Sequence, residues 1–131
     1  MSAAHLVTAL CFGGMTLFSF GFAAFLFSAL PPEVARATIR RAFPHFYLFV
    51  MATAALAAAL LWTSDPLGAS VLAAVAATTL PARQVLMPAI NRATDAGEKA
   101  RFKWLHSLSV VITLAHIAMT AYVLTRLGGG Q

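Results

Sequence analysis

The chain has 131 residues, of which 60% are hydrophobic and only 10% are charged, and its mean hydropathy is +0.82. Soluble domains carry about 25% charged residues, so this composition excludes an ordinary soluble protein and indicates that lipid is the solvent. The net charge of +5 could suggest nucleic-acid binding, but the basic residues cluster at the ends of apolar runs. We interpret them as signals of membrane topology and expect no nucleic-acid partner.

The first predicted membrane span covers residues 5–30 and ends before Pro31-Pro32. It is longer than the core of a signal peptide and lacks a basic start and an Ala-x-Ala cleavage site, so we expect the membrane to retain it. The only cysteine, Cys11, lies in this run, which excludes an internal disulfide. Small residues recur every seven positions, at Gly14, Gly21 and Ser28, and predict a face on which a neighbouring helix packs closely.

The second predicted span covers residues 43–62 and follows a charged, helix-compatible connector over residues 31–41. Pro44 lies in the first turn of this span, where a missing N–H group costs little. Residues 52–59 are almost all alanine, and such a thin helix favours close contact with its neighbours. A tight turn over residues 63–66 ends this part of the chain.

The third predicted span, residues 67–90, is the irregular one, because it is interrupted by Pro81, Arg83, Gln84 and Pro88. An apolar run that stopped at Leu80 would be too short to cross a bilayer, so we extend the helix through Arg83 with a kink near Pro81. Arg83 then lies roughly 10 Å inside the end of this run. A cation at that depth must snorkel to the interface or find a backbone carbonyl, a lipid phosphate, a bound anion or a carboxylate folding back from the following loop.

A polar loop over residues 91–103 leads to the fourth predicted span, residues 103–125. Four spans place this loop and the 31–41 connector on one side of the membrane, and together they hold seven basic residues. The positive-inside rule then predicts that both basic segments are cytoplasmic and that both termini lie outside. We therefore predict an all-α fold, in which residues 1–131 form one four-helix bundle in the plasma (inner) membrane.

Polar residues of the fourth span share one side of the predicted helix. His106, Ser109, Thr113, His116 and Thr120 fall within an arc of about 80°. Hydroxyl and imidazole groups inside a membrane need partners, so we expect this stripe to face the interior of the bundle. Together with polar residues of the second and third spans, it predicts a polar interior formed by Arg83, His106, Ser109, His45, Asn91, Gln84, Thr113 and His116.

His45 and His106 raise the question of a cofactor, because imidazole is a common axial ligand of haem iron and a common metal ligand. His116 lies about 15 Å deeper than His106, so one haem cannot use both of these residues. The sequence shows neither the local spacing of a metal motif nor C-x-x-C-H. We predict no metal and no cofactor, and keep haem or a metal held by His45 and His106 as an alternative.

Several short motifs occur in the order and spacing of a known family: Gly14-Met15 with the aromatic run ending at Leu30-Pro31, Phe43-Pro44 followed by Phe46 and Tyr47, Ala82-Arg83 followed by Pro88, and Phe102 with His106-x-x-Ser109. By these residues the chain resembles the transmembrane protein 205 family over nearly its whole length. Thr113 and Pro81 depart from the pattern, which has asparagine at both positions. The resemblance implies a four-helix integral membrane protein, linked in eukaryotic members to drug resistance and secretion, with no established substrate or reaction.

The sequence shows no hydrolase triad, phosphate-binding loop, dinucleotide fingerprint or pair of acids placed for catalysis, which favours a protein that is not an enzyme. We expect it to bind or transport a small solute or ion through its polar interior. One alternative is a structural or assembly subunit of a larger membrane complex, and another is a b-type haem or metal-binding protein. The expected partners are the lipid bilayer and either further copies of the chain or a larger complex.

Overall fold

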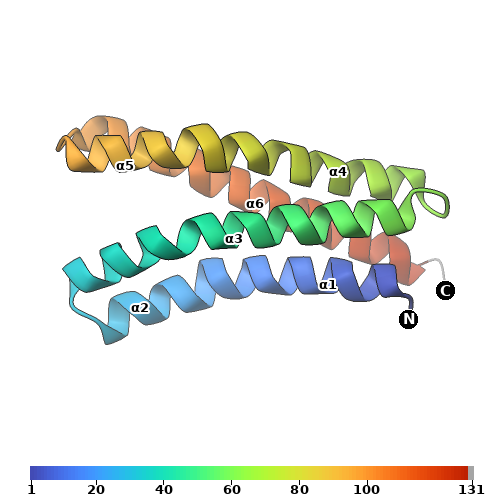
Figure 1. Cartoon of the computed structure of the whole chain (residues 1–131). Helices are drawn as coiled ribbons and strands as arrows, with labels where there is room; N and C mark the ends of the chain where they lie inside the picture. The colour runs from blue at the N-terminus through green and yellow to red at the C-terminus, as the bar shows by residue number, and fades with distance from the viewer. Residues whose placement is uncertain (130–131) are drawn as a thin grey trace.

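The computed structural model describes residues 1–129 and arranges them as four long antiparallel helical rods (Figure 1). The first rod comprises α1 (Ala3–Thr16), η1 (Leu17–Phe22) and α2 (Ala23–Ala29), and the second is α3 (Pro32–Leu61). The third comprises α4 (Pro66–Pro81), η2 (Ala82–Leu86) and α5 (Met87–Asp95), and the fourth is α6 (Lys99–Gly129). All four rods are long and apolar enough to cross a membrane, which confirms the predicted all-helical class with four spans.

The helices extend beyond the predicted membrane spans at several of their ends. The 31–41 connector is helical, because Pro32 lies at the first helical position and Glu33 is in the first turn, both of which favour a helix start. The prediction of a polar loop over residues 91–103 is wrong. Only residues 96–98 form a turn between α5 and α6, and Gly97 in this turn has a φ of +70°. Charged residues such as arginine and lysine sustain a helix beyond the hydrocarbon, so hydropathy alone places the helix ends too early.

Two π-helical turns interrupt the first and third rods. In η1 the N–H of Ala23 donates to the carbonyl of Phe18, and in η2 the N–H of Met87 donates to the carbonyl of Ala82. The irregularity predicted near Pro81 therefore takes the form of one widened turn directly after that proline. Such turns commonly mark functional segments, and both lie midway along their rods.

Towards the end of the bundle that holds the start of α1 and the end of α6, all four rods pack together (Figure 1). We call this end the packed half. Its core is made mostly of small or branched residues, and Ala57, Ala69, Leu72 and Val123 are fully buried there. Small side chains let the helix backbones approach closely, which is how helices associate in lipid without a hydrophobic driving force.

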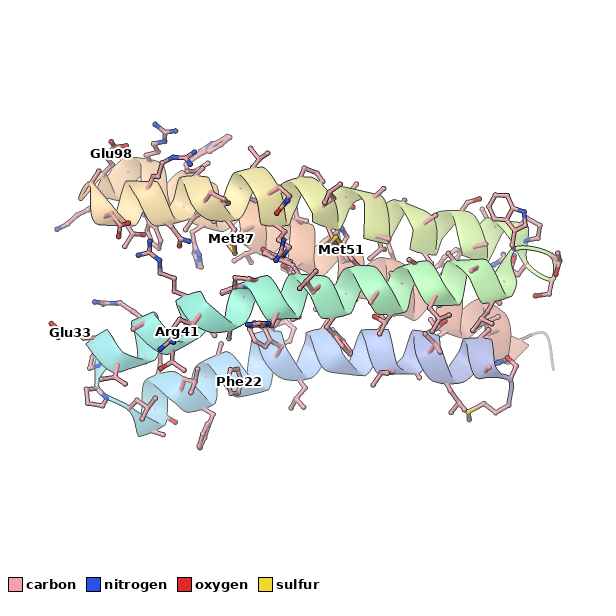
Figure 2. The ribbon with its side chains drawn as sticks, in the orientation of Figure 1. Phe22, Glu33, Arg41, Met51, Met87 and Glu98 are labelled. Atoms are coloured by element: carbon pink, nitrogen blue, oxygen red, sulfur yellow. The ribbon has the colours of Figure 1, made fainter. Side chains whose placement is uncertain are left out.

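At the opposite end the rods separate into two pairs, because α2 packs mainly on α3 while α5 packs on α6. We call this end the open half. Figure 2 shows charged side chains gathered there, among them the labelled Glu33, Arg41 and Glu98. Both basic segments of the sequence therefore lie at one end of the bundle, opposite the described ends of the chain.

Candidate functional site

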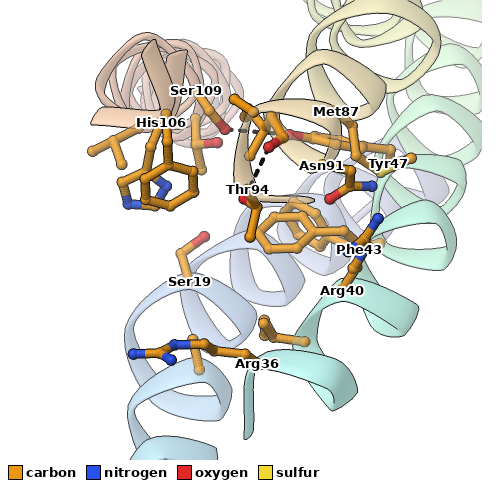
Figure 3. Close-up of a pocket in the computed structure, with 18 of the residues that line it drawn as sticks. Ser19, Arg36, Arg40, Phe43, Tyr47, Met87, Asn91, Thr94, His106 and Ser109 are labelled. Carbon is orange, nitrogen blue, oxygen red and sulfur yellow. Dashed lines mark hydrogen bonds between the residues drawn. The ribbon is translucent and has the colours of Figure 1, made fainter. Parts of the chain in front are cut away.

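A cavity of about 1040 Å³ lies between the two helix pairs of the open half (Figure 3). This is at the upper end of the volumes of ligand-binding pockets, which are about 300–1,000 Å³. Its lining residues fall within 18–27, 36–47, 87–98 and 99–114, so every rod contributes, and each only from its open half.

Aromatic side chains form the inner wall of the cavity. Phe18 of η1 stacks on Phe46 of α3 with ring centroids 4.2 Å apart, and Phe43 packs edge-on against Phe18 at 5.4 Å. Tyr47 follows on the same face of α3. Rings held against one another in this way give a broad apolar surface that loses little conformational freedom when a ligand covers it.

Basic residues surround the outer part of the cavity. Arg40 of α3 forms a bidentate ion pair with Asp95 of α5, at 2.8 and 2.9 Å, and thereby ties the two helix pairs together. Glu98 is 3.8 Å from Arg101, one turn further along α6. Within residues 1–129, Arg36 and Lys99 have no carboxylate at ion-pair distance, so they give this part of the cavity an uncompensated positive charge.

Hydrogen-bonding groups lie deeper between the helices (Figure 3). The hydroxyls of Tyr47 and Ser109 are 3.4 Å apart at the inner end of the cavity, where they link α3 to α6. Beyond this pair, Cys11, Met15 and Val50 are almost fully buried and fill the space between the rods. In the described part of the chain the cavity therefore ends midway along the bundle.

The structure divides the predicted polar-interior residues among three places. Asn91, His106, Ser109 and Thr113 line the cavity. Arg83, Gln84 and His116 lie outside its lining, nearer the middle of the bundle. His45 is exposed and lines a shallow groove between the first rod and α3, where it neighbours Gly14 and Leu17.

Arg83 does not join the polar stripe of α6. Its Nε donates to the backbone carbonyl of Pro44 at 3.2 Å, and one of its terminal nitrogens donates to the side-chain oxygen of Gln84 at 2.9 Å. A backbone carbonyl, which the sequence suggested as one partner for Arg83, is therefore in contact with it. The side chain is half-buried and connects η2 to α3.

The stripe on α6 turns inward along most of its length, as its spacing predicts. Ser109, His116 and Thr120 are buried and Thr113 is half-buried, whereas His106 is exposed and stacks on Phe102 at 5.4 Å. His116 forms a hydrogen bond of 2.7 Å with the hydroxyl of Thr78 on α4. The deeper part of the stripe therefore holds helices together, and only its outer part meets the cavity.

The two histidines considered as haem ligands are on different sides of the bundle. His106 lines the cavity, whereas His45 lines the separate groove beside Gly14. No group of three or more His, Cys, Asp or Glu side chains within residues 1–129 is arranged to hold a metal ion. His45 and His106 therefore line two separate surfaces of the bundle.

The small residues of the first rod also differ in their surroundings. A Cβ atom on Gly14 would overlap the ring of Phe49 on α3, so this glycine permits a close helix contact. A Cβ atom on Gly21 would meet only Leu17 of its own rod, at 3.1 Å. Ser28 is exposed, and its hydroxyl donates to the carbonyl of Phe25. Of these three residues, only Gly14 packs tightly against another helix of the same chain.

Sequence reasoning missed the residues that give the cavity its charge and its wall. It treated the basic residues of the 31–41 connector, among them Arg36 and Arg40, as topology signals and gave the phenylalanines no role in a site. A signal was present, because Arg36, Arg40, Phe43 and Tyr47 follow one another at intervals of four, three and four residues. That spacing puts two cations and two aromatic rings on one face of a helix.

Comparison with known proteins gives a family but no function. No curated protein and no solved structure matches the chain. Residues 6–99, well over half of the chain, match a family described as a Domain of unknown function (DUF4149). The match covers the first three rods and ends where α6 begins. This multi-pass, all-helical chain, with its cavity at one end of the bundle, therefore belongs to the DUF4149 family.

Proposed function

We propose that the protein binds, without catalysis, a molecule that combines an anionic group with an apolar body. The observation that carries this proposal is the composition of the cavity, in which unpaired cations lie beside an aromatic wall. Arg36 and Lys99 supply charge for the anionic group, and Asn91 supplies a nearby hydrogen-bonding amide. Phe18, Phe43 and the rings beside them cover the apolar body.

The shape of the cavity favours binding over passage through the chain. It ends near Tyr47 on α3 and Leu114 on α6, and the packed half beyond them has a core of fully buried side chains. A solute that crossed the membrane through this one chain would have to separate helices that are in close contact. A site open at one end needs no such rearrangement to bind and release a ligand.

The orientation in the membrane belongs to the same proposal. The seven basic residues of the two connecting segments lie at the open half, so the positive-inside rule supports a cavity on the cytoplasmic side of the inner membrane, with both termini outside. The motifs shared with the transmembrane protein 205 family support a relation to that family. Self-association of the chain is part of the proposal too, since Ser28 and its exposed neighbours leave a face of the first rod uncovered.

The test measures binding of octyl phosphate, an amphipathic anion, to the protein purified in an uncharged detergent. Calorimetric titration should detect it, while octanol, which lacks the charge, should bind much more weakly. The double variant Arg36→Gln/Lys99→Gln should weaken binding roughly 10- to 100-fold, because a hydrogen bond to a charged group contributes about 1.5–3 kcal/mol.

The matched control is the double variant Arg41→Gln/Lys103→Gln. It removes the same two residue types from the same two helices, at positions that do not line the cavity. Binding by this control should stay within about twofold of the unmodified protein. Equal weakening of octyl phosphate binding in both double variants would show that the overall positive charge, and not a site in the cavity, attracts the ligand. No binding of octyl phosphate to the unmodified protein would refute the proposal.

A further inference from the structure

The two sides of the cavity differ in how they are closed. Between α3 and α5, the Arg40–Asp95 ion pair bridges the helix pairs. Between α2 and α6 the rods diverge, because α6 packs on α1 and α2 packs mainly on α3 (Figure 1). The cavity lining contributed by the first rod is apolar except for Ser19 and includes Phe20, Ala23 and Phe27. The lining contributed by α6 combines apolar Phe102, Val110 and Leu114 with polar Lys99, His106, Ser109 and Thr113.

The exposed apolar side chains of this gap suit contact with acyl chains. Phe20, Phe27 and Val110 are each more than two-fifths exposed in the structure, so lipid would surround them in a bilayer. The charged part of the cavity lies at its outer end, at the level of Arg36 and Lys99. The cavity thus has the same order of polarity as one leaflet of a membrane, with charge outside and hydrocarbon inside.

Its depth agrees with this comparison. At 1.5 Å per residue, the lining rises about 16 Å along α3, from Arg36 to Tyr47, and about 22 Å along α6, from Lys99 to Leu114. Half of a bilayer is about 15 Å thick in its hydrocarbon core and about 20–22 Å thick with its headgroup region. A molecule with its phosphate beside Arg36 would therefore reach the Tyr47–Ser109 pair with a chain that spans one leaflet.

We infer that the ligand is a phospholipid with an anionic headgroup, which enters sideways from the bilayer between α2 and α6. Its phosphate lies between Arg36 and Lys99, and one acyl chain lies along the wall formed by Phe18, Phe43 and Phe46. This inference rests on the proposed function and names the class and the source of the ligand. The alternative source is a soluble amphipathic anion that reaches the cavity from water.

The experiment places the full-length protein in nanodiscs of phosphatidylcholine that contain a small fraction of spin-labelled phosphatidylglycerol or spin-labelled phosphatidylcholine. The motionally restricted part of the electron spin resonance spectrum reports the label held by the protein. We expect the restricted fraction to favour phosphatidylglycerol, and the preference to fall about fivefold for each cation removed at Arg36 and Lys99. The Arg41→Gln/Lys103→Gln control and the charge-conserving Arg36→Lys variant should keep the preference.

The sideways route is tested by narrowing the gap. Ala23 lines the cavity and is half-buried, whereas Ala24 is exposed and does not line it. Ala23→Trp should remove most of the restricted phosphatidylglycerol signal, while Ala24→Trp, with the same added side chain on the same helix, should leave it unchanged. Equal signals in the two tryptophan variants would overturn the route through this gap.

The two proposals fail in distinguishable ways. If octyl phosphate binds through Arg36 and Lys99 but the two labelled lipids are held equally, the lipid inference is wrong and the proposed function stands. If neither octyl phosphate nor phosphatidylglycerol is held, both are wrong. Octyl phosphate binding together with a selective phosphatidylglycerol signal, both dependent on Arg36 and Lys99, supports both.

Discussion

The packed half and the open half are built from the same four rods, yet only one of them encloses a cavity. In the packed half, the positions where helices meet hold Ala54, Ala57 and Ala69, all fully buried, and the backbones approach closely. In the open half the corresponding positions hold phenylalanine or arginine, as at Phe43 and Arg36. The size and charge of the facing residues therefore determine where the bundle closes. We therefore expect the packed half to contribute most of the stability, while the open half holds the candidate binding site.

The largest effect should come from enlarging a residue of the packed half. Ala57→Leu adds three carbon atoms at a position with no exposed surface, and overpacking of this kind destabilises a protein by about 1–3 kcal/mol. Ala37→Leu makes the same change on the same helix, but Ala37 borders the cavity and is exposed. Thermal unfolding in detergent, followed by circular dichroism, should show a clearly lower melting temperature for Ala57→Leu only. Equal losses would contradict the division into two halves.

The next effect concerns the partly buried hydrogen bond that joins α4 to α6. Thr78→Val keeps the shape of the side chain but removes the 2.7 Å bond to His116. Bonds between helices in membranes contribute roughly 0.5–2 kcal/mol, and the variant should lose about that much stability. Thr125→Val is the matched control, because the hydroxyl of Thr125 bonds only to the carbonyl of Tyr122 in its own helix. Unfolding curves that coincide for the two variants would show that the bond adds no stability.

A third change should alter ligand binding in the open half without changing the stability of the packed half. Asp95→Asn removes the carboxylate that holds Arg40 and leaves Arg40 available to a ligand in the cavity. We expect octyl phosphate to bind several-fold more tightly, with little change in the melting temperature, because the ion pair is exposed. Asp65→Asn also breaks an aspartate–arginine pair, but at the far end of the bundle, and should leave the affinity unchanged. A weaker affinity in Asp95→Asn would show that the pair supports the site.

Most of the fold follows from the sequence because the bilayer allows few solutions. Four apolar runs of sufficient length, separated by short polar segments, predict four spanning helices and put the two basic segments at one end. The helix ends do not follow from the same signal. Arg92 and Asp95 lie beyond the apolar run, yet α5 includes both of them, because backbone hydrogen bonding continues where the side chains reach water.

The site was less predictable, because sequence gives depth along a helix but not the direction a side chain faces after packing. His45 and His106 were paired because both begin their spans from the same side of the membrane. His45 is next to Phe46, and a step of about 100° places the two on different faces of α3. The Arg40–Asp95 pair joins residues 55 apart in sequence, and no local pattern reports such a contact.

The smallest expected effect is the pH dependence of stability that comes from the Asp65–Arg126 pair of the packed half. Asp65 accepts hydrogen bonds from Arg126 and from the N–H of Gly68, and these bonds hold the pKa of its carboxyl below the ordinary value. A carboxyl whose pKa is lower in the folded than in the unfolded protein stabilises the fold fully above the unfolded pKa, and this stabilisation is lost as the pH falls through the folded pKa. The melting temperature should therefore fall by a small amount when the pH is lowered below about 4. Asp65→Asn should have a lower melting temperature at neutral pH and a smaller drop on acidification, because it has no carboxyl to protonate at this position. The affinity of the open half for octyl phosphate, measured in the same samples, should be the same in the two proteins. An identical drop of the melting temperature in both would show that the Asp65–Arg126 pair does not couple protonation to stability.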